Sequence, residues 1–341
     1  MIKPNIAQSI LLYCALSIFS VTAYTQQNNA PRIEVYDKSA FKIINEFASV
    51  ETLGEGYSWS EGPVWVGDGG YLLFSDVPEN KVYKYKEGEG VTEYLAPSGS
   101  TNIYADAGTQ GSNGLLINGE GKLVLMQHGD RRISTYDLNT IGLDNDKPKY
   151  ESLVSHYQGK RLNSPNDAVF DSQGNLYFTD PPYGLSGGMN DPAKELDFQG
   201  IFKLSPKGEL SLIDDSVSYP NGIILSNDEQ SLIVAVSDPK KLEWIKFTKN
   251  SVGKFTHKKS FYDVSDLVDK KGHEGYPDGM VLHSSGNFFA TGPGGVWLFS
   301  PKGKVLARIF TGRKTANCTL SGDEKTLFMT AHDQLLALAL R

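Results

Sequence analysis

The sequence of 341 residues contains almost no cysteine. Its two cysteines are Cys14 and Cys318, and Cys14 lies in an apolar stretch close to the N-terminus. If that stretch is removed as a signal peptide, the mature chain keeps Cys318 alone and no intramolecular disulfide can form, although an oxidising compartment would permit one. The fold must then be stabilised by a large hydrophobic core, which a chain of this length can build.

Basic charge is also scarce. Lys and Arg number 33 against 40 Asp and Glu, which gives a formal net charge of −7, and no run of basic residues occurs. The sequence therefore lacks the electrostatic footprint of a nucleic-acid-binding protein. With 39% hydrophobic and 21% charged residues, it also falls outside the composition of disordered chains and of integral membrane proteins.

The N-terminus is predicted to carry a targeting segment. Lys3 precedes the apolar residues 10–23, and Val21-Thr22-Ala23 offers a small-residue cleavage site. Residues 1–23 are therefore predicted to be a secretory signal peptide, and the mature protein to be periplasmic or secreted with no membrane association. The stretch is too short for a convincing membrane span, and the alternative is an uncleaved N-terminal anchor.

Glycine and aromatic residues, by contrast, are frequent. The 35 Gly, 17 Tyr and 16 Phe favour turns and β-strands over helices. Six segments of the chain align with one another, and each begins with an oxygen-bearing side chain. They are Glu61-Gly-Pro-Val, Asn113-Gly-Leu-Leu, Asn166-Asp-Ala-Val, Asn221-Gly-Ile-Ile, Asp278-Gly-Met-Val and Asn317-Cys-Thr-Leu. Successive starting residues lie 52, 53, 55, 57 and 39 positions apart.

Each segment continues into a turn and then into an apolar strand, as in Gly67-Asp-Gly-Gly followed by Tyr71-Leu-Leu-Phe. A strand–turn–strand unit that recurs about every fifty residues is the signature of β-propeller blades. The sequence therefore predicts an all-β, six-bladed β-propeller. Residues 24–50 are expected to form an N-terminal arm and residues 51–341 the catalytic domain, and part of residues 33–55 is expected to supply a strand that closes the ring.

The repeat places its six polar residues at equivalent positions around the propeller channel. They are Glu61, Asn113, Asn166, Asn221, Asp278 and Asn317. Two carboxylates and four amides, without His or Cys, suit a hard divalent cation such as Ca²⁺, Mg²⁺ or Mn²⁺, and the cation would relieve the repulsion between the carboxylates. Carboxylates also bind Zn²⁺. The alternative is that these residues only form turns, which suits Asn113 and Asn317 best and does not suit Glu61.

Motifs around these residues resemble the gluconolactonase/regucalcin family. They are Trp59-Ser-Glu61-Gly-Pro-Val-Trp65, Ser164-Pro-Asn166-Asp-Ala-Val, Tyr177-Phe-Thr-Asp-Pro-Pro-Tyr-Gly184, Pro220-Asn221-Gly and Pro277-Asp278-Gly-Met. The resemblance extends from about Glu51 to Leu338. The run Asp-Pro-Pro-Tyr-Gly and the segment Gln127-His-Gly-Asp-Arg-Arg132 are most similar to the bacterial gluconolactonase branch.

The resemblance implies a six-bladed propeller in which a metal-activated water opens a sugar lactone to its hydroxy acid. Glu61, Asn221 and Asp278 would bind the metal, with Ca²⁺ as the expected ion. Asn166 would ligate the metal or touch the substrate. Asp278 would also serve as the catalytic acid/base, because a ligand at the open face of the metal can exchange a proton with water.

Two positions depart from the animal branch of the family. Ser164 stands where that branch has a substrate-binding Arg, and Gly184 falls near the place of its substrate-binding Glu. Asn113, His128 and Tyr183 are the further candidates for substrate contact at the channel mouth. His128 could instead be a structural residue that ties down its loop by hydrogen bonding to Asp130 or Arg131, and Tyr183 could be a packed loop anchor.

Three other residues are expected to take no part in chemistry. Trp59 and Trp65 are expected in the blade core. Gly184-Leu-Ser186-Gly-Gly188 matches the nucleophile-elbow pattern, but no helical pattern follows the serine, so Ser186 is not predicted to be a nucleophile.

The sequence thus predicts a metal-dependent lactone hydrolase that acts on a small-molecule lactone. One alternative is a promiscuous metal-dependent esterase or phosphotriesterase that uses the same ion. The other is a non-catalytic ligand-binding propeller with a structural metal, because propellers host unrelated functions.

Overall fold

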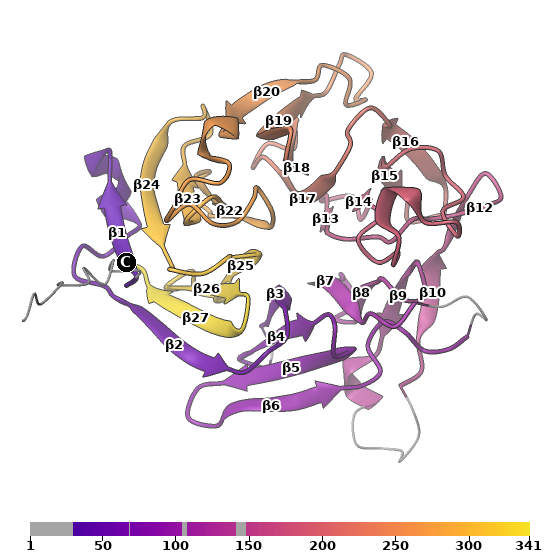
Figure 1. The fold of residues 1–341 in the computed structure, drawn as a ribbon, viewed down its shortest axis with the longest axis horizontal. Helices are drawn as coiled ribbons and strands as arrows, with labels where there is room; N and C mark the ends of the chain where they lie inside the picture. Colours follow the sequence, from indigo (N-terminus) through magenta and orange to yellow (C-terminus); the bar gives the residue numbers. More distant parts are fainter. Residues whose placement is uncertain (1–29, 68, 104–107, 141–147) are drawn as a thin grey trace, which may run out of the picture.

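The computed structural model of the protein describes residues 30–67, 69–103, 108–140 and 148–341, and the predicted signal peptide lies outside these ranges. Six antiparallel sheets stand around a central axis as the blades of a propeller (Figure 1). The predicted all-β, six-bladed architecture is confirmed. None of the helices within these ranges is both long and apolar enough to cross a membrane.

Each blade is built from strands that follow one another in the chain and pair with their neighbours in sequence. Blades 1 to 3 contain β3 (Ser60–Val66), β4 (Tyr71–Asp76), β5 (Lys81–Lys86) and β6 (Gly90–Leu95); β7 (Ser112–Ile117), β8 (Leu123–Gln127), β9 (Arg132–Tyr136) and β10 (Glu151–Val154); and β13 (Ala168–Phe170), β14 (Leu176–Asp180), β15 (Gly200–Leu204) and β16 (Leu210–Asp214). Blades 4 to 6 contain β17 (Pro220–Leu225), β18 (Ser231–Asp238), β19 (Lys241–Thr248) and β20 (Lys259–Asp263); β21 (Met280–Leu282), β22 (Phe288–Gly292), β23 (Gly295–Phe299) and β24 (Val305–Phe310); and β25 (Asn317–Leu320), β26 (Thr326–Ala331) and β27 (Gln334–Ala339). The connections contain the hairpin β11 (His156–Tyr157) and β12 (Lys160–Arg161) and the 3₁₀ helices η1 (Lys38–Lys42), η2 (Leu138–Thr140), η3 (Gly188–Asn190) and η4 (Ser265–Leu267).

The N-terminal part of the chain completes two blades. The strand β2 (Val50–Glu55) pairs antiparallel with β27, with Val50 opposite Leu338, and so becomes the outermost strand of blade 6. The strand β1 (Arg32–Val35) pairs with β24 at the outer edge of blade 5. The two ends of the described chain therefore share sheets, which closes the ring and covers edges that would otherwise be free to pair with other chains.

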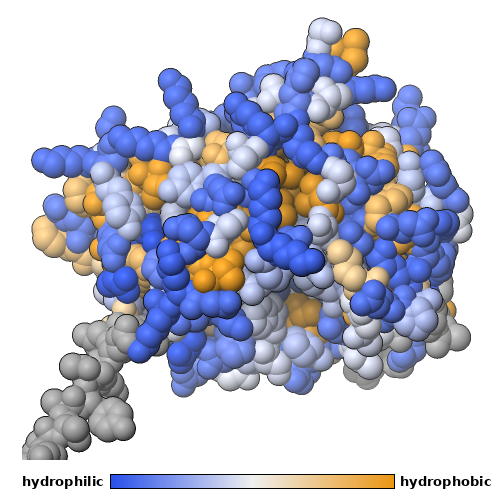
Figure 2. Space-filling view, turned by 45° about the horizontal axis from the view of Figure 1, so that its top comes forward, coloured by the Kyte–Doolittle hydropathy of each residue, from blue (hydrophilic) through white to orange (hydrophobic). Residues whose placement is uncertain are grey.

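The hydrophobic core lies within the blades and between neighbouring blades. Phe178 and Phe202 stack inside blade 3 with ring centroids 5.3 Å apart, and Trp244 of blade 4 contacts Phe299 of blade 5 at 5.1 Å. Cys318 is buried in this core as a free thiol. Figure 2 shows that hydrophilic side chains cover most of the visible face, with hydrophobic residues showing between them in separate patches. Apolar burial of this extent is the dominant stabilising term where no disulfide contributes.

The glycine that follows the polar residue in four of the six repeats has a packing reason. A Cβ on Gly62 would lie 2.0 Å from the carbonyl oxygen of Asn113, and one on Gly222 would lie 2.1 Å from that of Asp278. Each glycine thus lets the inner strand of its blade approach the polar residue of the next blade. Because the contact repeats around the ring, the polar side chains are brought to one level of the channel.

Hydroxyl groups on the second strand of a blade donate hydrogen bonds to the backbone of the polar repeat residue in the next blade. Ser75 Oγ donates to the carbonyl oxygen of Asn113 at 2.8 Å, and Thr179 Oγ1 donates to that of Asn221 at 2.7 Å. With the backbone carbonyl satisfied inside the protein, the side chain is the part of each polar residue that is left to face the channel.

Candidate active site

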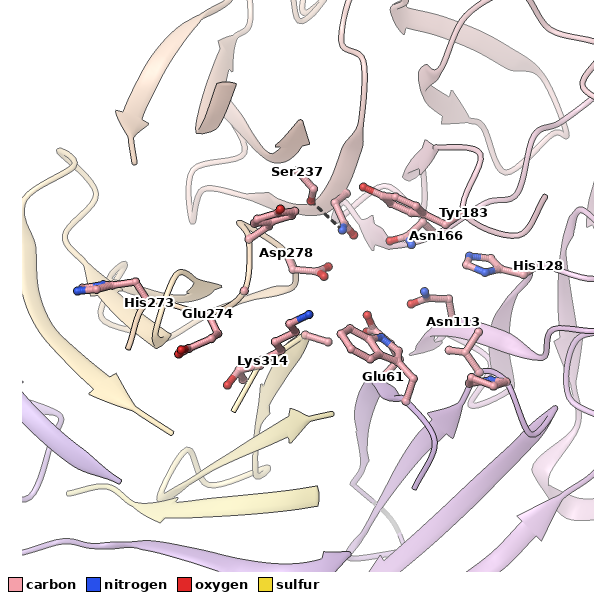
Figure 3. A pocket seen from close by; sticks show the side chains of 18 of the residues that line it. Glu61, Asn113, His128, Asn166, Tyr183, Ser237, His273, Glu274, Asp278 and Lys314 are labelled. Carbon is pink, nitrogen blue, oxygen red and sulfur yellow. Dashed lines mark hydrogen bonds between the residues drawn. The ribbon is translucent and has the colours of Figure 1, made fainter. Parts of the chain in front are cut away.

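A cavity of about 650 Å³ opens at one mouth of the channel. Five of the six polar repeat residues line it, and they are Glu61, Asn113, Asn166, Asn221 and Asp278. His128 and Tyr183 also line this cavity, so every residue proposed from the sequence for metal binding, catalysis or substrate contact lies in one place (Figure 3). The volume is in the range of small-molecule sites.

The two carboxylates of the cavity differ in exposure. Glu61 is 3% exposed, and its Oε2 accepts a hydrogen bond of 3.0 Å from the backbone N–H of Gly62. Asp278 is only half-buried and presents its carboxylate to the cavity (Figure 3). Burial raises the pKa of Glu61 to about 7. Burial, with the nearby charges of Glu61 and Asp167, raises the pKa of Asp278 well above its usual range.

Asn221 is held so that its amide oxygen faces the cavity. Its Nδ2 donates to Ser237 Oγ at 3.0 Å, and that hydroxyl donates in turn to the carbonyl oxygen of Pro277 at 2.6 Å. Because the hydroxyl hydrogen is committed to Pro277, Ser237 can only accept from the amide nitrogen. Asn221 Oδ1 is then left buried without a partner among the described residues, although unsatisfied buried acceptors are uncommon.

Aspartates at the ends of two second strands hold the loops that lead to the site. Asp76, the last residue of β4, accepts from the backbone N–H groups of Ser58 and Trp59 at 3.0 Å each. Asp180, the last residue of β14, accepts from Asn163 N at 2.7 Å and from Ser164 N at 2.8 Å. Glu61 and Asn166 follow these loops by two residues. The same device therefore positions a cavity side chain in blade 1 and in blade 3.

Ser164 is part of this support. It is fully buried, its Oγ donates to the Pro181 carbonyl at 2.6 Å, and the same Oγ accepts from Gly184 N at 2.8 Å. The residue that replaces the arginine of the animal branch thus anchors the loop of Tyr183 and does not line the cavity. Tyr183 stacks on Tyr219 with ring centroids 5.9 Å apart, so it is both a packed anchor and a cavity wall.

His128 forms the wall across the cavity from Asp278 (Figure 3). Its ring is 1% exposed, its Nδ1 lies 3.1 Å from Gln110 Oε1, and its Nε2 has no partner among the described residues. Burial lowers the pKa of His128 to about 3, so the ring is neutral. The hydrogen bond of the His128 ring thus connects its loop to that of Gln110, whereas the sequence had suggested Asp130 or Arg131 as the partner.

Asn317 departs from the pattern of the other five repeat residues. It does not line the cavity, and its Oδ1 accepts from the N–H of the following Cys318 at 2.8 Å. Its side-chain amide also lowers the pKa of Glu61 and of Asp167 by hydrogen bonding. Asn317, the first residue of the strand β25, therefore lies next to the site and contacts its acids from outside the cavity.

Sequence reasoning missed several residues of the cavity wall. Trp59, expected in the blade core, lines the cavity, whereas Trp65 is half-buried and stacks on Phe328. Gln110 and Lys314 also line it, and Lys314 extends its amine toward the space between Asp278 and Glu61 (Figure 3). The position of Trp59 two residues before Glu61 was the available signal. Gln110 and Lys314 lie outside the repeated motif, so no pattern marked them.

The donor set fits a divalent cation. Among the described residues no three His, Cys, Asp or Glu side chains cluster as a metal site, so the candidate centre consists of two carboxylates and the neighbouring amides. Two acids whose pKa values are both raised, one of them by the charge of the other, and an amide oxygen of the same cavity that has no donor are arranged for a positive charge. Oxygen ligands of this kind suit hard ions.

The serine of the nucleophile-elbow pattern, which the sequence does not predict to be a nucleophile, lies away from the cavity. Ser186 is exposed, and it does not line the cavity. It is followed by the 3₁₀ helix η3, which is too short to act as the helix of a nucleophile elbow. The chemistry of the protein is therefore expected at the channel mouth.

The fold and the site place the protein in the class of six-bladed propellers that carry acids and amides around the central axis. A comparison with known families then identifies its family. The model of the SMP-30/Gluconolactonase/LRE-like region matches residues 59–333, and the chain belongs to that family. The matched range contains every site residue named above, so the family resemblance predicted from the motifs is confirmed.

Individual relatives show how far the similarity extends. The gluconolactonase of Zymomonas mobilis is 38% identical over 293 residues, which is 85% of this chain and 80% of that protein. The diisopropyl-fluorophosphatase of Loligo vulgaris is 25% identical over 285 residues, 80% of this chain and 86% of that protein. The solved structure of a gluconolactonase from Xanthomonas campestris has a TM-score of 0.75 at 29% identity and covers 92% of this chain and 95% of its own.

Proposed function

We propose that the protein is a metal-dependent lactone hydrolase of the gluconolactonase type, which opens a sugar lactone to its hydroxy acid. The observation that carries this proposal is that the buried acid Glu61, the half-buried acid Asp278 and the unpartnered amide oxygen of Asn221 line one open cavity. The family is generally metal-dependent, and the relative reported above with 38% identity to this chain is a gluconolactonase. These facts support lactone hydrolysis at this site.

Glu61, Asn221 and Asp278 would hold the cation, with Asn166 either as a fourth ligand or in contact with the substrate. Ca²⁺ is the ion we propose, and Mg²⁺, Mn²⁺ and Zn²⁺ are the alternatives. When bound, a divalent ion polarises the lactone carbonyl and makes water more acidic. The oxygen-only donor set, without His, favours the hard ions Ca²⁺, Mg²⁺ and Mn²⁺ over Zn²⁺.

Asp278 is the acid/base in this proposal because of its position. It is the more exposed of the two carboxylates, whereas Glu61 is buried and tied to the backbone N–H of Gly62. Asp278 can therefore take a proton from the attacking water and return it to the alkoxide that leaves when the ring opens. Asn166 would orient the substrate by hydrogen bonding, and the Lys314 ammonium can neutralise the carboxylate that forms.

The experiment is a panel of lactones and esters assayed on metal-stripped protein, with Ca²⁺, Mg²⁺, Mn²⁺ and Zn²⁺ added back one at a time. Hydrolysis of sugar lactones that is lost on chelation and restored by one ion supports the proposal. Activity that survives complete chelation would contradict it. Tight metal retention without any turnover would indicate a binding propeller with a structural metal.

A second candidate function is a broader esterase or phosphotriesterase. It is favoured by the 25% identity to a diisopropyl-fluorophosphatase over 80% of this chain. The same panel separates the two candidates, because an organophosphate or simple ester turned over faster than any sugar lactone would favour the second.

We further propose that the mature protein is periplasmic or secreted after removal of residues 1–23, on the strength of the leader composition alone. N-terminal sequencing of the protein purified from a secreting host tests this, because an intact Met1 would contradict cleavage.

A further inference from the structure

The His128 ring is locked on the cavity wall by its surroundings. His128 N donates to the Gly111 carbonyl at 3.1 Å, and Gly129 N donates to that of Gln110 at 3.1 Å, so the two loops that carry the pair are joined. On the other side, a Cβ on Gly184 would lie 2.8 Å from the Cβ of His128. The ring therefore has little room to move, and its nitrogens keep fixed directions.

The hydrogen bond to Gln110 determines which nitrogen carries the proton. An amide oxygen can only accept, so the Nδ1 that lies 3.1 Å from Gln110 Oε1 must be the protonated one. In a neutral imidazole the other nitrogen then carries a lone pair. Nε2 of His128 is thus an acceptor, it is buried, and no donor among the described residues reaches it.

A second acceptor without a donor lies on the same side of the cavity. Asn113 is 6% exposed, and its Oδ1 has no hydrogen-bond partner within the described part of the chain. Figure 3 shows Asn113 between His128 and Glu61. Buried acceptors are normally satisfied, so a wall with two of them favours a ligand that brings hydrogen-bond donors.

We propose that His128, positioned by Gln110, is a specificity residue that accepts a hydrogen bond from a hydroxyl group on the substrate. This inference rests on the proposed lactonase function and narrows its substrate class. A polyhydroxylated lactone offers hydroxyl donors at several ring positions. An unsubstituted lactone or a simple ester has no donor at all and would leave Nε2 unpaired, which is the basis for rejecting it.

The test compares glucono-δ-lactone with δ-valerolactone, which has the same ring without hydroxyl groups. In H128F the kcat/KM for glucono-δ-lactone should fall about 10- to 100-fold, while that for δ-valerolactone stays within about twofold. H128Q, whose amide oxygen can approach the place of Nε2, should recover part of the preference. The matched control is H283F, because His283 lies on the turn between β21 and β22 and does not line the cavity.

Each outcome decides between the explanations. If H128F and H128Q lower both efficiencies equally and also lower the unfolding temperature, His128 is structural and the inference is wrong. If the ratio of the two efficiencies is unchanged in H128F, the inference is also wrong, and the lactonase function stands. If the wild-type protein hydrolyses neither lactone, the proposed function fails and this inference fails with it.

Discussion

The acids at the cavity, whose pKa values are raised in the folded protein, predict an unusual pH dependence of stability when metal is removed. An unfolded Glu ionises near 4.5, whereas burial raises the pKa of folded Glu61 to about 7. Between these values the folded protein holds a proton that the unfolded chain has released. Stability must then fall as the pH rises, by about 1.4 kcal/mol per pH unit for one group.

For Glu61 alone this amounts to about 3 kcal/mol between pH 4.5 and pH 7. Asp278 and Asp167 act in the same direction, because burial raises the pKa of both. A bound cation reverses the sign, since it lowers the pKa of its carboxylate ligands. In the metal-loaded protein these carboxylates therefore contribute stability above their ordinary pKa, and this contribution is lost as the pH falls. The metal-free and metal-loaded curves should therefore diverge with rising pH.

Urea unfolding at pH 5, 6, 7 and 8, followed by tryptophan fluorescence with chelator or with Ca²⁺, measures both curves. The variant E61Q keeps the size of the side chain and removes its titration, so the difference from wild type isolates the Glu61 contribution from the background of other carboxylates. A metal-free stability that rises between pH 5 and pH 7 relative to E61Q would refute the reasoning. So would a Ca²⁺ effect that is the same at all four pH values.

Three further predictions concern single residues. D278N should still bind metal, more weakly, but lose most turnover, and an unchanged kcat would rule out the proposed acid/base role. D180N keeps only one of the two carboxylate oxygens that accept from the loop before Asn166. We therefore expect the unfolding free energy to fall by about 1–3 kcal/mol and KM to rise. An unfolding free energy and a KM equal to those of the wild type would contradict this. G62A would place a Cβ 2.0 Å from the carbonyl oxygen of Asn113 and should lower the unfolding free energy by about 2 kcal/mol or more. The control G119A, whose Cβ would meet open space, should leave the stability unchanged. Equal melting temperatures for the two variants would contradict the packing role of Gly62.

Much of the fold and part of the site could be predicted from the sequence because both repeat. A blade is a local unit, so strand, turn and strand recur at similar spacing, and Tyr71, the start of a predicted strand, is also where β4 begins. Equivalent positions of the repeat share one radius and one level of the channel. That symmetry is why Glu61, Asn221 and Asp278, which are more than two hundred residues apart at the extremes, could be expected around one cavity.

The tertiary structure alone decided which way the side chains face and what surrounds them. Asn221 points its oxygen at the cavity because Ser237, committed to a carbonyl elsewhere, can only accept from its nitrogen. His128 presents a lone pair because Gln110 comes from a different loop to hold the other ring nitrogen. Lys314 reaches the cavity from outside the repeated motif. Such contacts join residues that no period relates, so they become visible only when the blades are assembled.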